Sequence, residues 1–248
     1  MTTIQGFAGP GDAPALKAFD ASVRGTSERT WQSALAAAPY WAPSPGPVVI
    51  VAPHPDDETL GAGGLMYSCA AVGHAVSVIS VTDGEAAHPG ASDLAAIRRR
   101  ELAAALVHLS SNPVPCHRLR VADGQVTANE SYVQRAIEAR LPSRATLVAP
   151  FECDGHPDHD AVGRACLRIA RMHHLILARY PIWAWHHCLP QAFSGSSIVR
   201  FALSARARRA KARAISCFAS QLEGTESEAV VPAHVLMYFA RPYETFLL

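Results

Sequence analysis

Short apolar runs rich in β-branched residues alternate with helical patterns along the chain from residue 48 onward. Such runs, bounded by glycine, proline or aspartate, are typical of buried strands, whereas apolar positions that recur every three or four residues indicate helices. The pattern predicts strands at 48–51, 75–82, 117–121, 145–149, 175–180 and 198–203. It predicts helices at 27–38, 61–72, 91–109, 130–141, 160–173 and 204–221, and a further helix capped by Asp12.

This alternation predicts an α/β fold, with a mostly parallel β-sheet flanked by helices on both faces. The Pro-rich stretch 43–47 cannot continue a helix and ends a helical N-terminal lead-in, residues 1–46. No internal repeat or further linker interrupts residues 47–248. We therefore expect these residues to form a single domain.

Composition narrows the classes of function. The chain has 248 residues, of which 49% are hydrophobic and 17% charged, which is enough apolar material for one well-buried core. A formal net charge of +1 favours neither nucleic acid nor an anionic membrane surface as a partner. The densest basic stretch, 206–213, has alanines at helical spacing and is expected to be a solvated helix face.

Cysteine usage and the termini bear on the compartment. The six cysteines include no C-x-x-C pair, which in a chain of this length indicates free thiols in a reducing environment. The first residues lack a charged segment followed by an apolar one, so no signal peptide is expected. No apolar run approaches the roughly 20 residues that span a bilayer. We expect a cytoplasmic protein without a membrane-spanning segment.

A polar cluster, His54-Pro-Asp56-Asp57-Glu58, follows the first expected strand. An imidazole and a carboxylate three positions apart on a proline-stiffened turn can converge on one metal ion, and adjacent aspartates point in different directions. A catalytic zinc takes three protein ligands and keeps one position for water, beside which a free carboxylate is a natural general base. Taken alone, the cluster also fits a surface turn in which Asp57 or Thr59 caps a helix.

A second cluster, His156-Pro-Asp158-His159, follows the strand expected at 145–149. Because ligands of open α/β sheets bind outside the carboxyl ends of the strands, we expect the two clusters to meet there. His159 is then a candidate third metal ligand, and His156 a candidate cation or proton donor that stays off the metal. Each cluster alone also fits an ordinary polar loop, whereas the two together favour a metal site.

Three further residues are candidate substrate contacts. Asp83 and Glu85 follow the strand expected at 75–82 and fall at the same edge of the sheet. Arg98 lies in the middle of an expected helix, where it either pairs with Glu101 on the same face or reaches the site.

The glycine-rich run Gly61-Ala-Gly-Gly64 also follows a strand, as phosphate-binding loops do. It lacks the G-x-G-x-x-G spacing, and no lysine follows as in a P-loop. Close packing of a helix against the sheet is the favoured interpretation.

At these residues the chain resembles the PIG-L (LmbE-like) family of zinc-dependent N-acetylglucosamine deacetylases. The resemblance covers most of the chain from Val48 onward. It rests on Pro-His-Pro-Asp-Asp-Glu at 53–58, Val-Thr-Asp-Gly-Glu at 81–85, Arg-Arg-x-Glu-Leu at 98–102 and Gly-His-Pro-Asp-His at 155–159. It implies a Rossmann-like parallel sheet over residues 47–248 and one bound Zn²⁺, for which another divalent metal can substitute.

The resemblance also implies roles for individual residues. His54, Asp57 and His159 would bind the zinc. Asp56 would be the general base that activates a zinc-bound water, and His156 would stabilise the oxyanion or protonate the departing amine. Some family members carry a tyrosine where this chain has Asp154, which makes Asp154 a candidate for binding a sugar hydroxyl.

The resulting hypothesis is a hydrolase that removes an N-acetyl or other N-acyl group from a glucosamine-containing small molecule or glycoconjugate. The alternative is a metal-free, Rossmann-type nucleotide-binding or regulatory protein in which the histidines are incidental. A third possibility keeps the metal but hydrolyses a phosphoester. It is less favoured because the sequence lacks the second carboxylate-rich ligand set of a two-metal site.

Overall fold

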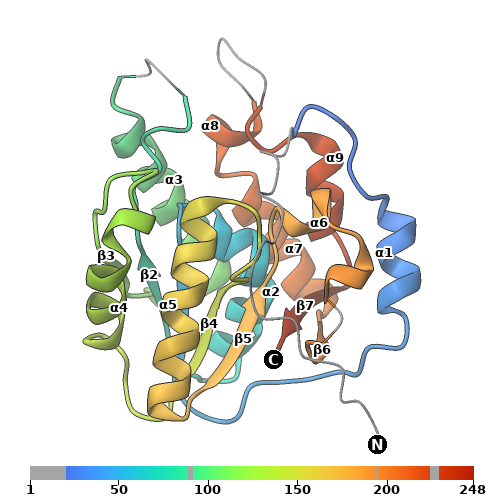
Figure 1. Cartoon of the computed structure of the whole chain (residues 1–248), viewed down its shortest axis with the longest axis horizontal. Helices are drawn as coiled ribbons and strands as arrows, with labels where there is room; N and C mark the ends of the chain where they lie inside the picture. Colours follow the sequence, from blue (N-terminus) through green and yellow to red (C-terminus); the bar gives the residue numbers. More distant parts are fainter. Residues whose placement is uncertain (1–20, 89–91, 194, 224–228) are drawn as a thin grey trace, which may run out of the picture.

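One mixed sheet forms the centre of the molecule (Figure 1). The computed structural model describes residues 21–88, 92–193, 195–223 and 229–248. Within them the strands are β1 (Val48–Ala52), β2 (Val76–Ser80), β3 (Cys116–Arg118), β4 (Thr146–Pro150), β5 (Ile176–Tyr180), β6 (Ile198–Ala202) and β7 (Tyr243–Leu247), in the order β3-β2-β1-β4-β5-β7-β6. β1 to β5 pair in parallel, and β7 is antiparallel to both of its neighbours. The expected α/β fold with a mostly parallel sheet is therefore confirmed.

Helices cover both faces of this sheet. They are α1 (Glu28–Leu35), α2 (Asp57–Ala71), α3 (Leu94–Leu109), α4 (Glu130–Glu138), α5 (Pro157–His173), α6 (Ala184–His187), α7 (Ala205–Ile215), α8 (Ala219–Leu222) and α9 (Ala233–Leu236). Short 3₁₀ turns lie at η1 (Thr127–Asn129), η2 (Pro190–Phe193) and η3 (Met237–Phe239). In Figure 1, α4 and α5 lie in front of the sheet and α2 and α7 behind it.

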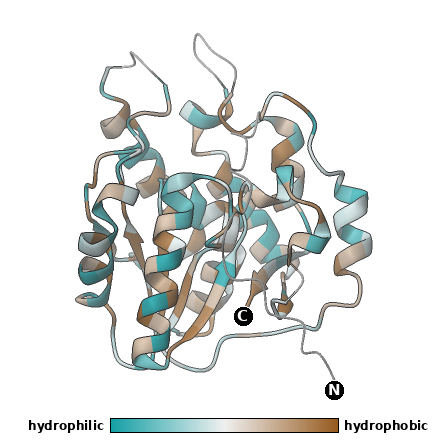
Figure 2. Ribbon diagram, in the orientation of Figure 1, coloured by the Kyte–Doolittle hydropathy of each residue, from teal (hydrophilic) through white to brown (hydrophobic). Residues whose placement is uncertain are grey.

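Alternate residues of β1 belong to opposite cores. Val48 and Ile50 pack in a cluster with side chains of α2, α3 and α7, whereas Val49 and Val51 pack in a second cluster with side chains of α4 and α5. All five β1 residues are buried, because a parallel strand covered on both faces has no solvated side. Figure 2 accordingly shows hydrophobic residues concentrated on the strands.

The direction in which the chain adds strands to the sheet reverses at the centre of the sheet. From β1 the connections run outward to β2 and β3, and from the adjacent β4 they run the other way to β5. Such a reversal opens a crevice beyond the carboxyl ends of the two central strands, where ligands of open α/β sheets bind. Both histidine clusters, residues 54–58 and 156–159, follow these two strands, so the fold places them at the crevice.

Two helices begin earlier than the sequence pattern predicts, because each cluster contains a helix start. α2 begins at Asp57 rather than residue 61, and α5 begins at Pro157 rather than residue 160. Proline suits the first helical position, where its missing N–H would have no intrahelical partner. The helix expected at 204–221 is divided into α7 and α8.

β7 is absent from the sequence prediction because a charged residue interrupts its apolar pattern. Glu244 lies inside the strand and is buried, with its Oε1 2.6 Å from Nζ of Lys211. Its two oxygens also accept the backbone N–H groups of Gly64 and Leu65, at 2.7 and 2.8 Å. The carboxylate therefore joins β7 to α2 and α7 inside the fold. Lys211 is the buried member of a basic stretch whose arginines are exposed, as expected.

The glycine-rich run lies inside α2 and serves close packing, as expected. A Cβ atom on Gly61 would lie 2.3 Å from the Tyr180 ring, and one on Gly64 would lie 2.4 Å from Leu203. Neither position therefore accepts a side chain without displacing its neighbour.

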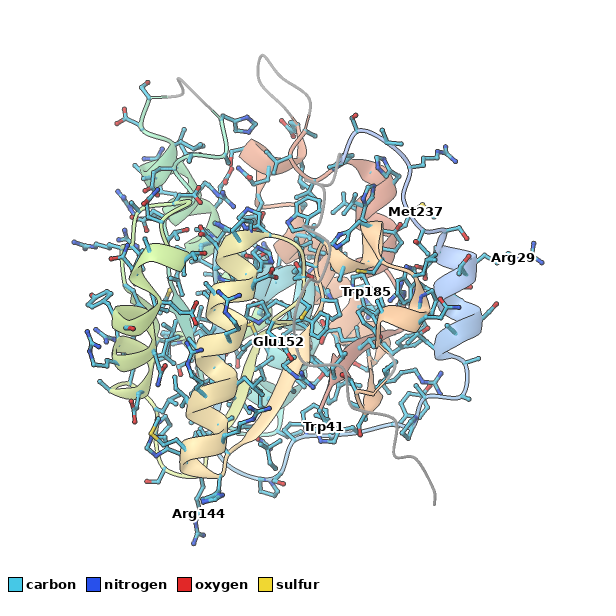
Figure 3. The ribbon with its side chains drawn as sticks, in the orientation of Figure 1. Arg29, Trp41, Arg144, Glu152, Trp185 and Met237 are labelled. Carbon is cyan, nitrogen blue, oxygen red and sulfur yellow. The ribbon has the colours of Figure 1, made fainter. Side chains whose placement is uncertain are left out.

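The described part of the N-terminal lead-in packs against the C-terminal half of the chain. Trp31 is fully buried, and its indole N–H donates to the carbonyl of Trp185 at 2.7 Å. Figure 3 shows Trp185 among the side chains of the interior and Arg29 projecting outward from α1. The helix expected at Asp12 lies outside the described residues, and the boundary between residues 46 and 47 stays a prediction.

Within the described residues, none of the helices is both long and apolar enough to cross a membrane.

Candidate metal centre

The turn after β1 presents two carboxylates in different directions. Asp56 is the N-cap residue of α2 and has a backbone φ of 134°, a strained value for a residue with a side chain. Its Oδ1 faces the Arg98 guanidinium at 3.3 Å. Asp57 Oδ2 instead accepts the backbone N–H of His54 at 2.9 Å and faces the imidazoles. The strained turn thus gives adjacent aspartates separate surroundings.

Three donor atoms from the two clusters form a nearly equilateral triangle. His54 Nδ1 and His159 Nε2 are 3.2 Å apart, and Asp57 Oδ2 lies 3.3 Å from each of them. A tetrahedral ion bound at about 2.0–2.1 Å holds its ligands about 3.3 Å apart. The triangle therefore fits one such ion, as the expected zinc requires.

Carboxylates hold the far nitrogen of both of these imidazoles. His159 Nδ1 lies 2.8 Å from Asp154 Oδ2, and His54 Nε2 lies 3.0 Å from Asp123 Oδ1 and 3.4 Å from Asp158 Oδ2. Metal-binding histidines characteristically donate their second ring N–H to such a partner, which fixes the tautomer and orients the ring. The lone pairs of His54 Nδ1 and His159 Nε2 are thereby directed to the triangle.

Asp57 is held in the charged state that a ligand needs. Burial alone raises the pKa of a carboxyl group, because it disfavours the ion. Here the neighbouring imidazoles of His159 and His54 outweigh burial and hold the pKa of Asp57 well below its ordinary value.

Asp56 has the opposite environment. Burial raises the pKa of Asp56 to about 7, against the opposing charge of Arg98. The Arg98 guanidinium is itself anchored, since it donates to the carbonyl oxygens of Pro55 at 2.7 Å and Gly84 at 3.0 Å. A carboxyl group with a pKa near neutrality, held beside a metal centre, has the proton affinity of a general base.

His156 lies against the two other imidazoles, with ring centroids 4.9 Å from His54 and 4.7 Å from His159. Burial and the charges of these two neighbours lower the pKa of His156 to about 3. Its Nδ1 accepts the backbone N–H of Asp158 at 3.2 Å, so the ring proton resides on Nε2. This lowered pKa favours a neutral His156 with one N–H donor, whereas its expected role as oxyanion stabiliser or proton donor to the amine stays a prediction.

His156 also belongs, with His54 and His159, to a set of imidazoles whose ligand atoms lie within 4.8 Å of one another. The triangle that includes Asp57 is tighter and anionic. It is therefore the better fit to a divalent cation.

A cavity of about 410 Å³ opens at this cluster. It is lined by polar residues of both clusters, among them Asp56, Asp57 and His156, and by Arg98. Its other wall is largely apolar and includes Trp183 and several valines. Reacting groups of a bound ligand therefore have room beside the donor triangle.

The residues expected to contact substrate lie in different places. Arg98 lines the cavity, but Asp83 pairs with Arg118 and lies 3.6 Å from Arg99. Glu85 accepts the backbone N–H of Asp123 at 3.0 Å. Asp83 and Glu85 are not among the residues that line the cavity and instead hold neighbouring groups, so their expected contact with substrate stays a prediction.

The carboxylate of Asp154 is turned toward the protein interior. It is fully buried, and its oxygens accept the backbone N–H groups of Ile182, Trp183 and Ala184 besides facing His159. No part of the carboxylate remains for a sugar hydroxyl. Asp154 instead orients the imidazole of His159.

Sequence reasoning missed Asp123, which lines the cavity beside His54. Its loop is held by Asp158, whose oxygens accept the N–H groups of Gly124 at 2.8 Å and Val126 at 3.2 Å. The signal was present, because Asp123-Gly124 follows β3 at the same edge of the sheet as the two histidine clusters.

Comparisons with known proteins agree with this geometry. The profile of the PIG-L family, described as GlcNAc-PI de-N-acetylase, matches residues 49–170. None of the curated proteins matches the chain significantly. Residues 49–170 thus match the PIG-L family, and the expected class of enzyme, a deacetylase, is confirmed.

Solved structures share the fold. The zinc-inhibited form of teicoplanin deacetylase has a TM-score of 0.63 at 18% identity, over 81% of this chain and 96% of that one. The A40926 pseudoaglycone deacetylase has a TM-score of 0.61 at 22% identity, with the same coverage. N,N'-diacetylchitobiose deacetylase from Pyrococcus horikoshii has a TM-score of 0.55 at 19% identity, over 78% and 76%. These likenesses confirm the fold.

Proposed function

We propose that this protein is a zinc-dependent hydrolase that removes an N-acetyl group, or another small N-acyl group, from a glucosamine-containing small molecule or glycoconjugate. The observation that carries the proposal is the donor triangle of His54, Asp57 and His159 beside the separate, protonatable carboxyl of Asp56. The match of residues 49–170 to the PIG-L family supports the choice of bond.

His54, Asp57 and His159 are the residues that would hold the ion. A divalent metal there supplies a Lewis acid that polarises a carbonyl group and acidifies water. Nitrogen and carboxylate donors suit zinc and also accept other divalent metals.

Asp56 acts as the general base. Its carboxylate takes a proton from the water that attacks the carbonyl carbon of the amide. The C–N bond then breaks, the departing amine takes the proton that Asp56 had accepted, and acetate is formed. Arg98 keeps the Asp56 carboxylate oriented toward the cavity through their 3.3 Å contact.

His156 stabilises the developing oxyanion as a neutral donor. Its Nε2–H is available, because Nδ1 is occupied by the backbone N–H of Asp158. A preorganised donor costs no reorganisation when charge develops, and such groups are worth about 10²–10³ in rate.

The proposed substrate class comes from the structural neighbours. Structural neighbours are named for teicoplanin, a pseudoaglycone and diacetylchitobiose, all of them sugar conjugates or sugars. We extend this class to the present chain and place the reaction in the cytoplasm, with a small-molecule glycoside rather than nucleic acid as partner. The near-neutral formal charge of +1 supports that choice.

Product analysis of the zinc-loaded protein tests the proposal. A panel of N-acetylglucosaminyl conjugates and phosphoesters is incubated with the protein, and acetate and phosphate are quantified. Acetate release is expected. Phosphate release without acetate would favour a phosphoesterase, and tight nucleotide binding by a protein purified without metal would favour the nucleotide-binding alternative.

A further inference from the structure

Gln221 in the cavity wall carries a buried polar atom without a partner among the described residues. Gln221 lines the cavity and is 1% exposed, and its amide oxygen Oε1 accepts no hydrogen bond from the described residues. Buried side-chain polar atoms are normally paired, because burial removes their hydration without replacing it. The oxygen therefore lacks a donor that a ligand of this cavity can supply.

The other end of the same amide is firmly held. Gln221 Nε2 donates to Ser220 Oγ at 2.9 Å, and that hydroxyl donates to Glu101 Oε2 at 2.7 Å. The Ser220 backbone N–H also donates to Glu101, at 2.8 Å. Since the Ser220 proton is committed to a carboxylate, the serine oxygen can only accept from the amide. This relay assigns the nitrogen end of Gln221 to Ser220 and leaves the oxygen as the unpaired end.

Apolar side chains also line this cavity, among them Val230, Val231 and Val235, none of which has a side-chain acceptor. Val231 also donates its backbone N–H to the Gln221 carbonyl at 3.0 Å, which ties this part of the wall to the glutamine. A polar group of a ligand on this part of the described wall can therefore pair with the glutamine amide, but not with the apolar side chains of the valines.

We propose that Gln221 is a specificity-determining residue: its Oε1 accepts a hydrogen bond from a hydroxyl group of the substrate sugar while the scissile amide lies at the donor triangle. This inference rests on the proposed function and deepens it. A site built to hydrogen-bond a hydroxyl discriminates against an analogue without it, because the buried acceptor is then left unpaired. Glu101 and Ser220 are positioning residues that hold the amide.

The test combines changes in the protein with changes in the substrate. Methyl N-acetylglucosaminide and analogues that lack one ring hydroxyl at a time are offered to the zinc-loaded parent protein and to Gln221→Leu, and kcat and KM of acetate release are measured. With the parent protein, one deoxy analogue is expected to lose about 10-fold in kcat/KM, the scale of one hydrogen bond. Gln221→Leu should lose about the same factor with the complete substrate and no longer distinguish it from that analogue.

A control variant separates this role from general damage. Gln134 lies on α4 and accepts from Arg168 at 2.8 Å, remote from the cavity lining. Gln134→Leu should keep the parent protein's discrimination between substrates. Equal kcat/KM of the parent protein for every analogue, or unchanged discrimination by Gln221→Leu, would overturn the proposal.

Binding of the reaction product distinguishes this inference from the proposed function. Calorimetry compares methyl glucosaminide with its deoxy analogues on the parent protein and Gln221→Leu. The same hydroxyl dependence is expected in the parent protein and its loss in the variant. If this pattern appears without acetate release by the parent protein, the proposed reaction is contradicted while the role of Gln221 stands. Hydroxyl-independent binding by the parent protein overturns the role of Gln221.

Discussion

His159 Nδ1 lies 2.8 Å from Asp154 Oδ2, while the opposite ring nitrogen of His159 faces Asp57 and His54. The carboxylate of Asp154 is held in place, because its oxygens also accept backbone N–H groups of residues 182–184. The chain after β5 thus fixes a carboxylate, the carboxylate fixes an imidazole, and the imidazole presents its lone pair to the donor triangle.

The first prediction concerns Asp154→Asn. The amide retains an oxygen for the N–H groups of Ile182 and Ala184, but the nitrogen that replaces Oδ2 cannot accept the N–H of His159 or of Trp183. We expect zinc affinity to fall by about 10–100-fold, the usual effect of losing such a partner. Competition with a chromophoric chelator measures it. Asp160→Asn is the matched control, because Asp160 accepts the Gly155 N–H at 3.0 Å. Equal affinities of the two variants would contradict the role given to Asp154.

The second prediction concerns pH. Burial raises the pKa of Asp56 to about 7, and Arg98 opposes this rise. A general base must be deprotonated, so kcat/KM should fall as the pH drops through the pKa of Asp56. A bound divalent cation lowers that pKa further, which places the acid limb at or below about pH 7.

Removing the positive charge of Arg98 should shift the acid limb of the pH profile. Arg98→Met should move it to higher pH, because the cation that lowers the pKa of Asp56 is lost. Arg99→Met is the control, since Arg99 lies 3.6 Å from Asp83 rather than beside Asp56. The pH profile of kcat/KM measures both. An acid limb that stays in place in Arg98→Met would contradict the assignment of Asp56 as base.

The third prediction links metal to protons. Burial lowers the pKa of His159, but Asp57 and Asp154 outweigh it and raise that pKa to about 9. A ligating imidazole must be free of its Nε2 proton, so metal binding displaces a proton near neutral pH. Apparent zinc affinity should therefore fall about 10-fold per unit decrease in pH for each proton released. Calorimetry in buffers of different ionisation enthalpy counts these protons. Affinity that is independent of pH would contradict His159 as a ligand.

Much of the fold follows from local patterns in the sequence. β1 is a continuous apolar run because it is buried on both faces, and this pattern is visible in the residues themselves. β7 escapes such reasoning, because Glu244 is compatible with a strand interior only once Lys211 and the N–H groups of α2 are in place. The ion pair that neutralises Glu244 joins residues 33 positions apart in the sequence, so the local hydrophobic pattern cannot predict it.

The features of the site also divide into those that the sequence predicts and those that depend on the folded structure. The two histidine clusters lie at strand ends, so their convergence follows from topology. The roles of Asp154 and Asp83 do not follow from topology. The sequence does not distinguish an aspartate that faces a ligand from one that faces the backbone. Burial and hydrogen bonding decide between these cases: Asp154 accepts N–H groups inside the fold, and Asp83 pairs with Arg118.

The fourth prediction concerns stability. Lys211 and Glu244 form a buried ion pair at 2.6 Å. Lys211→Met leaves the Glu244 carboxylate without its cation, and the free energy of unfolding is expected to fall by about 3 kcal/mol or more. Denaturant unfolding measures the difference, with Arg209→Met on the exposed side of α7 as the control. The double variant Lys211→Met with Glu244→Gln should be more stable than Lys211→Met alone, and the absence of any such recovery would show that the pair is not the cause.

The central claim is the division of labour between adjacent aspartates, with Asp57 in the donor triangle and Asp56 as the base. Asp56→Asn tests it most directly when metal content and acetate release are measured on the same preparation. The account predicts near-stoichiometric zinc, as in the parent protein, together with a loss of about 10²–10⁴ in acetate release. Full acetate release by the zinc-loaded Asp56→Asn protein would contradict it.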